Sequence, residues 1–247
     1  MIWENFKGKF HESWHPKIKP FIESQECDEI YSFLKSEGGR KKIAPLSVNT
    51  FRCFLETPYD QIKVIMVGMC PYHTFRDDMP VADGLLMGCS VTNYVQPSLE
   101  KFYRGIEIDL HQGLKVNHSA NPDVSYLAKQ GVLMLNAGLT VEANKPGSHN
   151  FIWEPFMKYL FQEVFDVIRV PVIFLGKEAA NIKKYIDPFT WVFEVSHPAS
   201  AAYSGTEWDP EGTFRNVNNQ CTKITSVIFD GTPLTCDHRI YHLIETP

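Results

Sequence analysis

Four short apolar runs constrain the fold of this chain more than any other feature of its sequence. Each is four to six residues long and rich in β-branched or aromatic side chains, as is typical of a buried strand. Stretches with helical patterning separate them, and strands that alternate with helices indicate an α/β domain with a mainly parallel sheet. We therefore expect one domain over 1–247, with a four-stranded sheet flanked by helices and a short extension at 1–13. The runs are Ile62–Val67, Val132–Leu135, Val172–Leu175 and Trp191–Val195.

The expected helices are marked by start and stop signals and by apolar spacing. One stretch begins with Pro-Ser and continues to a Gly, and another ends at two consecutive glycines. The helices predicted in this way are Ser24–Glu37, Pro97–Gln112, Glu154–Ile168 and Gly212–Asp230.

The composition is that of a globular protein, with 44% hydrophobic and 21% charged residues, which argues against disorder and coiled coils. The 24 Lys and Arg residues stand against 29 Asp and Glu residues, so the formal net charge is −5. Nucleic-acid-binding proteins usually carry a basic surface, so the charge alone argues against DNA as a partner.

The cysteines and the amino terminus bear on the cellular compartment. None of the cysteines forms a C-x-x-C pair, so a zinc ribbon is not expected. The first ten residues lack the apolar segment of a signal peptide, and no apolar run is long enough to span a membrane. We expect an intracellular protein with free thiols, no membrane association and a monomeric state. The cysteines are Cys27, Cys53, Cys70, Cys89, Cys221 and Cys236.

One match to a metalloprotease signature is misleading. The segment His11–His15 reads HESWH, which fits H-E-x-x-H. That motif needs both histidines on one face of a helix, and we expect Pro16 to hold His15 out of helical geometry. We therefore expect a polar segment and no metal site here.

Polar loops follow each predicted strand. The first strand leads into Gly68–His73 (GMCPYH), the second ends at Asn136, the third at Gly176 and Lys177, and the fourth at Ser196 and His197. Ligands of open parallel sheets bind beyond the carboxyl ends of the strands. We therefore expect Tyr72, His73, Asn136 and His197 to converge on one pocket. Taken singly, each of these residues also fits a turn-forming or capping role.

The chemistry of this set suits a pyrimidine ring. Asn136 can both donate and accept hydrogen bonds along an amide-like edge, and His197 can donate to an oxygen that gains negative charge. Tyr72 supplies a flat wall. The chain has no G-x-S-x-G elbow for acyl transfer and no phosphate-binding P-loop, and we expect no cofactor.

These motifs resemble the family 1 uracil-DNA glycosylases over most of the chain, from about Trp14 to Phe229. Gly68–His73 is similar to the family's GQDPYH, and Gly131–Val141 (GVLMLNAGLTV) followed by Ser148-His149 is similar to GVLLLNxxLTV…SH. His197–Ala202 (HPASAA) resembles HPSPLS, and Gln96–Leu99 (QPSL) resembles PPSL.

The resemblance implies an enzyme that flips a base out of single- or double-stranded DNA and hydrolyses its N-glycosidic bond. It implies that His197 stabilises the departing base anion, that His73 lies near the attacking water, and that Cys70 stands at the water-activating position. It further implies that Asn136 reads the Watson–Crick edge and that Tyr72 crowds the C5 position, with the Met69 backbone also facing the base. The DNA contacts that it implies are Gln96, Pro97, Ser98, Ser148, His149, Gly176, Lys177, Ser200 and Ala201.

Four departures from the family pattern are present. The aspartate of GQDPYH is Cys70, and the glutamine is Met69. The family segment HGLAFS becomes Asp83–Ser90 (DGLLMGCS), so we expect the stacking aromatic residue to be replaced by Cys89, or by Gly88. The intercalating leucine of HPSPLS becomes Ala201.

Two hypotheses follow from the retained and the lost residues. The first is a DNA glycosylase with a shifted substrate, such as a modified pyrimidine, in which Asp77, Asp78 or Asp83 replaces the missing carboxylate. The second is a catalytically weak protein that binds DNA or a protein partner. The net charge and the acidic segment Thr206–Gly212 favour the second, whereas the four retained polar residues favour the first.

Overall fold

The computed structural model describes residues 3–111 and 121–219 of the chain. Its centre is a four-stranded sheet in the order β5-β2-β7-β8, and all three pairings within that sheet are parallel. The prediction of a mainly parallel four-stranded sheet is therefore confirmed. The strands are β1 (Ile43–Ala44), β2 (Val64–Gly68), β3 (Phe75–Arg76), β4 (Met79–Pro80), β5 (Val132–Asn136), β6 (Val141–Glu142), β7 (Val172–Leu175) and β8 (Val192–Val195).

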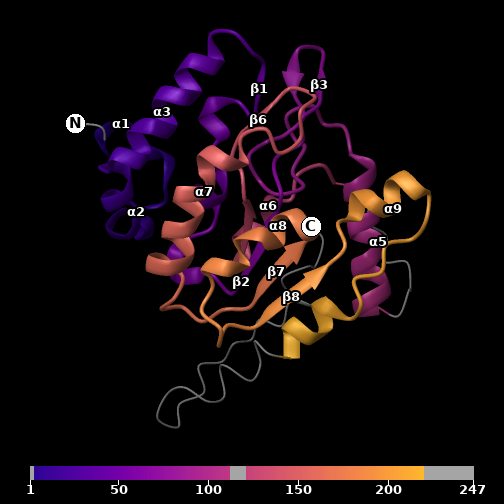
Figure 1. The fold of residues 1–247 in the computed structure, drawn as a ribbon. Coiled ribbons are helices and arrows are strands. Elements are labelled where there is room, and N and C mark those ends of the chain that lie inside the picture. The colour runs from indigo at the N-terminus through magenta and orange to yellow at the C-terminus, as the bar shows by residue number, and fades with distance from the viewer. Residues whose placement is uncertain (1–2, 112–120, 220–247) are drawn as a thin grey trace, which may run out of the picture.

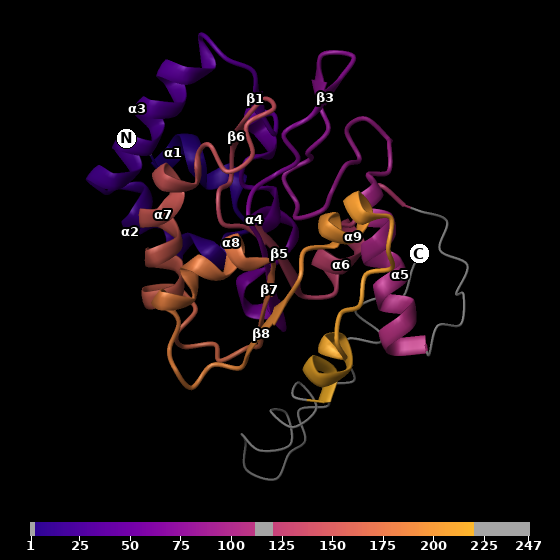
Figure 2. The same ribbon diagram turned by 45° about the vertical axis from the view of Figure 1, so that its right-hand side comes forward.

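Helices cover the sheet on both sides (Figures 1 and 2). Helices α2, α3 and α7 lie on one side of the sheet, and α5 and α9 lie on the other. Within the described ranges, no helix has both the length and the apolar character needed to cross a membrane. The helices are α1 (Trp3–Phe6), α2 (His15–Ile22), α3 (Gln25–Gly38), α4 (Arg52–Glu56), α5 (Pro97–His111), α6 (Ser125–Lys129), α7 (Asn150–Tyr159), α8 (Lys177–Ala180) and α9 (Pro198–Ser204).

The predicted helices agree with the structure except near their ends. Ser24 caps α3, because its side chain accepts a hydrogen bond from the Cys27 amide. Helix α7 begins earlier than predicted, at Asn150, and continues into a π-helical turn over Leu160–Val164. The predicted last helix is present over 213–219, and the rest of it lies outside the described residues.

Three of the four strands are buried on both faces, because they alternate their side chains between two helical layers, whereas the edge strand β8 is half-buried. Met66 and Ile173 face Phe102 of α5, while Ile65 on the other face points toward Phe161. Every residue of β2, β5 and β7 is buried. Strands buried on both faces read as continuous apolar runs, and this explains why they were visible in the sequence.

The H-E-x-x-H match resolves into two separate elements. His15 has helical dihedral angles and is the first residue of α2, so the expectation that Pro16 would exclude it from the helix was wrong. His11 precedes that helix and uses its ring to accept a hydrogen bond from the Ser13 amide. The two imidazoles therefore do not share one helical face.

A buried ion pair anchors the long loop between β4 and α5. The carboxylate of Asp83 has no solvent exposure and lies 2.8 Å from the Arg52 guanidinium. It also accepts hydrogen bonds from the Leu85 amide at 3.0 Å and from the Ser90 amide at 3.1 Å, and from the Ser90 hydroxyl at 2.6 Å. A buried carboxylate with this many donors holds the loop 83–90 in one conformation.

We predict that Asp83→Ala destabilises the fold by about 3 kcal/mol, because it leaves the Arg52 charge without its buried partner. Denaturant unfolding followed by circular dichroism measures the change. The control is Asp60→Ala at an exposed position, which should cost less than about 0.5 kcal/mol. Equal stability of the two variants would contradict the anchoring role of Asp83.

Candidate active site

The loops that follow three strands of the sheet enclose a cavity of about 620 Å³. Cys70, Tyr72 and His73 line it from the segment after β2, and His197 lines it from the segment after β8. The topology therefore brings three of the four predicted residues to one cavity. Asn136 ends β5 beside them, directly opposite Gly68 in the sheet, but it does not line the cavity.

His197 is held in one tautomer. Its Nδ1 accepts a hydrogen bond of 3.0 Å from the Ala199 amide at the start of α9, so in the neutral ring the proton lies on Nε2. Burial lowers the pKa of His197 to about 4, so the ring is neutral near pH 7. A neutral imidazole with a fixed Nε2–H is a hydrogen-bond donor to an anion that forms in the cavity.

The third strand approaches this histidine closely. Gly176, which follows β7, has a φ of +88°, and a Cβ atom at this position would lie 3.1 Å from the His197 Cβ. Glycine adopts this φ without steric cost, which other residues do not. The glycine thus lets the loop with Lys177 pass beside the imidazole and form part of the cavity wall.

Cys70 is a neutral thiol. Burial raises its pKa, although the Gly147 amide donates a hydrogen bond of 3.3 Å to the sulfur and opposes that shift. A protonated thiol neither abstracts a proton from water nor offsets a positive sugar. Cys70 therefore does not supply the carboxylate chemistry that the resemblance associates with its position.

Tyr72 forms one wall of the cavity and is held by Ser98. The two hydroxyl groups are 2.8 Å apart, and burial raises the pKa of Tyr72, so the phenol stays protonated. Ser98 is buried, and its hydroxyl holds the Tyr72 ring in the cavity wall through this hydrogen bond, so it is not exposed to a phosphate. The prediction that the loop at Gln96–Ser98 contacts DNA therefore concerns other groups of that loop than the Ser98 hydroxyl.

The part of the wall next to Tyr72 carries no ring. Leu86 and Met87 line the cavity, whereas Cys89 is fully buried and does not, which corrects the expectation for Cys89. Met87 has a φ of +63°, an uncommon value for a residue other than glycine, and the Tyr72 hydroxyl lies 3.8 Å from its sulfur. Sequence reasoning missed both residues because the loop differs in length from the family segment.

Two polar atoms near the cavity are buried and have no partner within the described residues. They are Nδ1 of His73, which lines the cavity, and Oδ1 of Asn136, whose residue is only 2% exposed. An unpaired buried polar atom costs about 1–3 kcal/mol, so proteins rarely keep one without a use.

The predicted DNA contacts divide into accessible and inaccessible residues. Lys177, Ser200 and Pro97 are exposed, and Gln96 and Gly176 are half-buried at the cavity. His149 and Ala201 are buried in this structure, and their contact with DNA stays a prediction.

His149 and the half-buried Ser148 have structural roles in their own loop. The ring of His149 shares a 2.9 Å hydrogen bond with the Thr140 hydroxyl, and burial lowers its pKa. Ser148 accepts a hydrogen bond from the Glu142 amide at 2.9 Å. An exposed aromatic residue, Tyr203, lies on α9 at the cavity, where the sequence pattern led us to expect only the small Ala201.

None of the three aspartates considered as a replacement carboxylate lines the cavity. Asp83 is occupied by Arg52, and Asp78 pairs with Lys42 in an exposed turn that also contains Asp77. The one carboxylate among the described residues of the cavity wall is Glu178, at the exposed start of α8.

The acidic segment after α9 packs back onto the protein. Trp208 is buried, stacks on Phe102 of α5 and donates a 2.8 Å hydrogen bond to the Ser196 carbonyl. Glu207 lies 3.6 Å from Lys101 and 3.7 Å from Arg104, so its charge is partly offset. The segment therefore carries less uncompensated negative charge than its sequence suggests.

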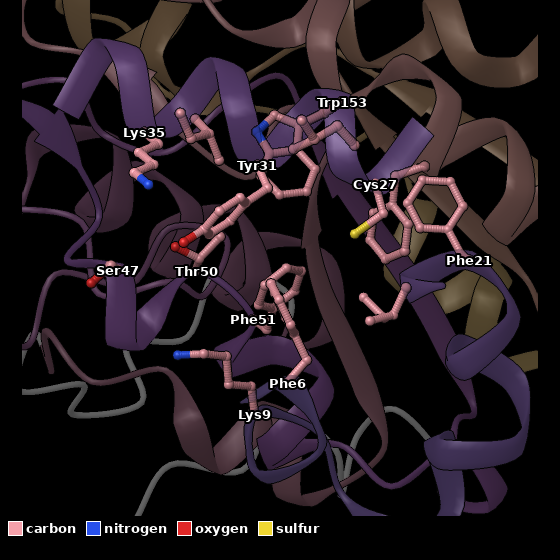
Figure 3. Close-up of a pocket in the computed structure, with 14 residues that line it drawn as sticks. Phe6, Lys9, Phe21, Cys27, Tyr31, Lys35, Ser47, Thr50, Phe51 and Trp153 are labelled. Carbon is pink, nitrogen blue, oxygen red and sulfur yellow. The ribbon is translucent and has the colours of Figure 1, made fainter. Parts of the chain in front are cut away.

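A second cavity of about 420 Å³ lies between the amino-terminal helices and α7. Figure 3 shows Lys9 and Lys35 at one end and Phe21 and Cys27 at the other, with Trp153 above the apolar part. No residue of the four-stranded sheet lines it. The polar set at the strand ends therefore belongs to the first cavity alone.

The fold and the first cavity define an open-sheet α/β protein with a ligand site at the carboxyl ends of parallel strands. A sequence model of the Uracil DNA glycosylase superfamily matches residues 56–221. The chain belongs to this superfamily.

Named relatives and solved structures agree with this assignment. The chain is 32% identical over 200 residues to a uracil-DNA glycosylase of Streptococcus uberis, covering 79% of this chain and 87% of that protein. It is 36% identical over 159 residues to one of Ureaplasma parvum, covering 64% and 71%. Its fold is similar to the crystal structure of mimivirus uracil-DNA glycosylase, with a TM-score of 0.74, 21% identity and coverage of 89% and 86%.

We predict that the His197 ring titrates near pH 4 when its proton resonances are followed by NMR, because burial disfavours the charged form. The unfolded chain binds this proton with a pKa near 6.5, so the unfolded state carries more protons between pH 6.5 and 4. The histidine's contribution to the free energy of unfolding is therefore complete above pH 6.5 and decreases as the pH falls.

The comparison variant for this prediction is His197→Asn, which cannot titrate in this range. Its unfolding free energy should decrease less between pH 7 and pH 5 than that of the original chain. A His197 midpoint near 6.5, or the same pH dependence in both proteins, would contradict the prediction.

Proposed function

We propose that this protein is a DNA glycosylase that flips a uracil-like or modified pyrimidine into the first cavity and hydrolyses its N-glycosidic bond. The observation that carries the proposal is the neutral, tautomerically fixed His197 in a cavity walled by Tyr72. The curated relatives named uracil-DNA glycosylase support the reaction class. DNA is the partner, and its target base leaves the stack because the reacting bond is inaccessible within the duplex.

The reaction separates into the departure of the base and the capture of the sugar. The bond between the sugar C1′ and the base N1 breaks, and its electron pair leaves with the base as an anion. Nε2–H of His197 donates to an oxygen of that anion. Water then adds to C1′, and the proton that it releases neutralises the base.

Because the Cys70 thiol is neutral, we infer that most of the catalysis comes from stabilisation of the leaving base. No carboxylate stands at this position to orient water or to offset the positive sugar, so stabilisation of the base anion dominates. We infer slower hydrolysis than an enzyme with an aspartate there achieves.

The wall of the cavity supports a shifted substrate. Leu86 and Met87 provide flexible aliphatic surface and no aromatic plate, which removes stacking of about 1–3 kcal/mol per base. Met is adaptable and accommodates ligands of different outline. We therefore propose that modified pyrimidines are accepted as well as, or in preference to, uracil.

A weak or inactive protein that binds DNA or a protein partner is the second candidate. The observation in its favour is that Glu178 is the one carboxylate among the described residues of the cavity wall, so the position of Cys70 has no carboxylate. The base-release assay below separates the two candidates, since only the first predicts abasic sites.

We predict that the protein releases base from at least one member of a panel of DNA strands that carry uracil or modified pyrimidines. His197→Ala should reduce release by about 10²–10³-fold, because it removes the donor to the departing anion. Abasic sites are measured by alkaline cleavage of labelled single- and double-stranded DNA. The control is His11→Ala, whose ring lies in the amino-terminal segment and should leave the rate unchanged. No release from any substrate would favour the second candidate.

We predict that Cys70→Asp raises the rate of uracil release about tenfold or more, because a carboxylate there stabilises the positive sugar and orients water. The Gly147 amide that now contacts the thiol can donate to the new carboxylate. Cys70→Ser is the matched control, since it adds an oxygen without a charge and should leave the rate within a few-fold of the original. An equal gain in both variants would show that the charge is not the cause.

A further inference from the structure

Oδ1 of Asn136 is a buried hydrogen-bond acceptor that no described residue uses. Asn136 ends β5 opposite Gly68, with only 2% exposure, and its Oδ1 has no partner within the described residues. An amide oxygen with two lone pairs is costly to bury unpaired. An unpaired acceptor beside a ligand cavity can form a hydrogen bond with a ligand that reaches it.

Leu86 and that amide both border the empty side-chain position of Gly68. The position that a Cβ atom on Gly68 would take lies 2.3 Å from Leu86 Cδ1 and 3.1 Å from Asn136 Oδ1. Gly68 makes room for both because it lacks a side chain.

The backbone holds Leu86 at this place. Its amide donates a 3.0 Å hydrogen bond to the Met134 carbonyl in β5, and the neighbouring Asp83 anchors the whole loop. Leu86 lines the cavity and Asn136 does not, so an entering base meets the leucine before the amide.

We propose that Leu86 is the residue that determines specificity in this cavity, because it withholds the Asn136 amide from the base. The inference rests on the proposed function and adds what the cavity selects for. With Leu86 in place, the inner wall is apolar, and binding depends on the shape and apolar surface of the pyrimidine. The Watson–Crick edge of uracil then forms no hydrogen bonds with Asn136. Uracil therefore binds weakly, and modified pyrimidines compete well with it.

The test is the binding of free uracil, measured by isothermal titration calorimetry on the full chain at pH 7. Leu86→Ala should bind uracil about tenfold more tightly than the original protein, because the exposed amide then forms hydrogen bonds with the base. Adding Asn136→Ala to Leu86→Ala should abolish the gain. Leu85→Ala is the matched control: it shortens a buried leucine that does not line the cavity, and it should leave uracil binding unchanged.

Truncation of a buried leucine lowers stability, so thermal unfolding of each variant is measured alongside. If Leu86→Ala does not fold, Leu86→Val removes both δ-methyl groups at smaller cost and should show the same direction of change. A folded Leu86 variant that binds uracil no more tightly than the original, or a gain that survives Asn136→Ala, would overturn the proposal. Binding of the free base requires no bond cleavage, so absence of glycosylase activity would refute the proposed function without deciding this point.

Discussion

The register of the parallel sheet is the constraint on which the rest of the structure depends. Pairing of β2 with β5 places Gly68 opposite Asn136, and pairing of β7 with β8 places Leu175 opposite Val195, one step before the loops that carry Gly176 and His197. All the strands run in the same direction, so these loops emerge at one edge. A shift of one residue would turn each strand's side chains to the opposite face and would separate Asn136 from the glycine that makes room beside it.

The second determinant is the loop 83–90, which no strand pairing orders. Its conformation comes from the Asp83 carboxylate, which satisfies Arg52, two amides and a hydroxyl at once, and from the hydrogen bond of the Leu86 amide to the Met134 carbonyl. The loop in turn positions Leu86 and Met87 against the cavity. The shape of the site is thus set by a buried charge about which the loop folds, and the positive φ of Met87 is tolerated because this network holds it.

These two determinants explain what the sequence could and could not predict. The four strands of the central sheet and the long helices α3, α5 and α7 were predicted, because continuous burial and helical spacing give clear local patterns, whereas the short helices and the two-residue strands were not predicted. The meeting of Tyr72, His73 and His197 followed from topology. The role of Asp83 was not predictable, because a structural aspartate and a reactive one are the same residue in the sequence. They differ only in the groups that surround them in the fold. Met87 was missed because a loop of altered length has no unique alignment, and its burial appears only in three dimensions.

The electrostatics of the site follow from one physical effect that acts on two residues. Burial disfavours charge on His197 and on Cys70 alike, so it leaves a neutral imidazole and a neutral thiol in one cavity. For the imidazole this is useful, because a donor with a fixed proton interacts more strongly with a forming anion than with a neutral base. For the thiol it removes the negative charge that would have stabilised the sugar. In the proposed reaction, His197 stabilises the base half of the transition state and Cys70 leaves the sugar half without a negative charge, so the proposal predicts a preference for bases that leave readily as anions. Under the proposed function, an electron-withdrawing substituent at C5 makes a pyrimidine a better leaving group in this cavity, provided that the substituent is small enough to fit beside Tyr72.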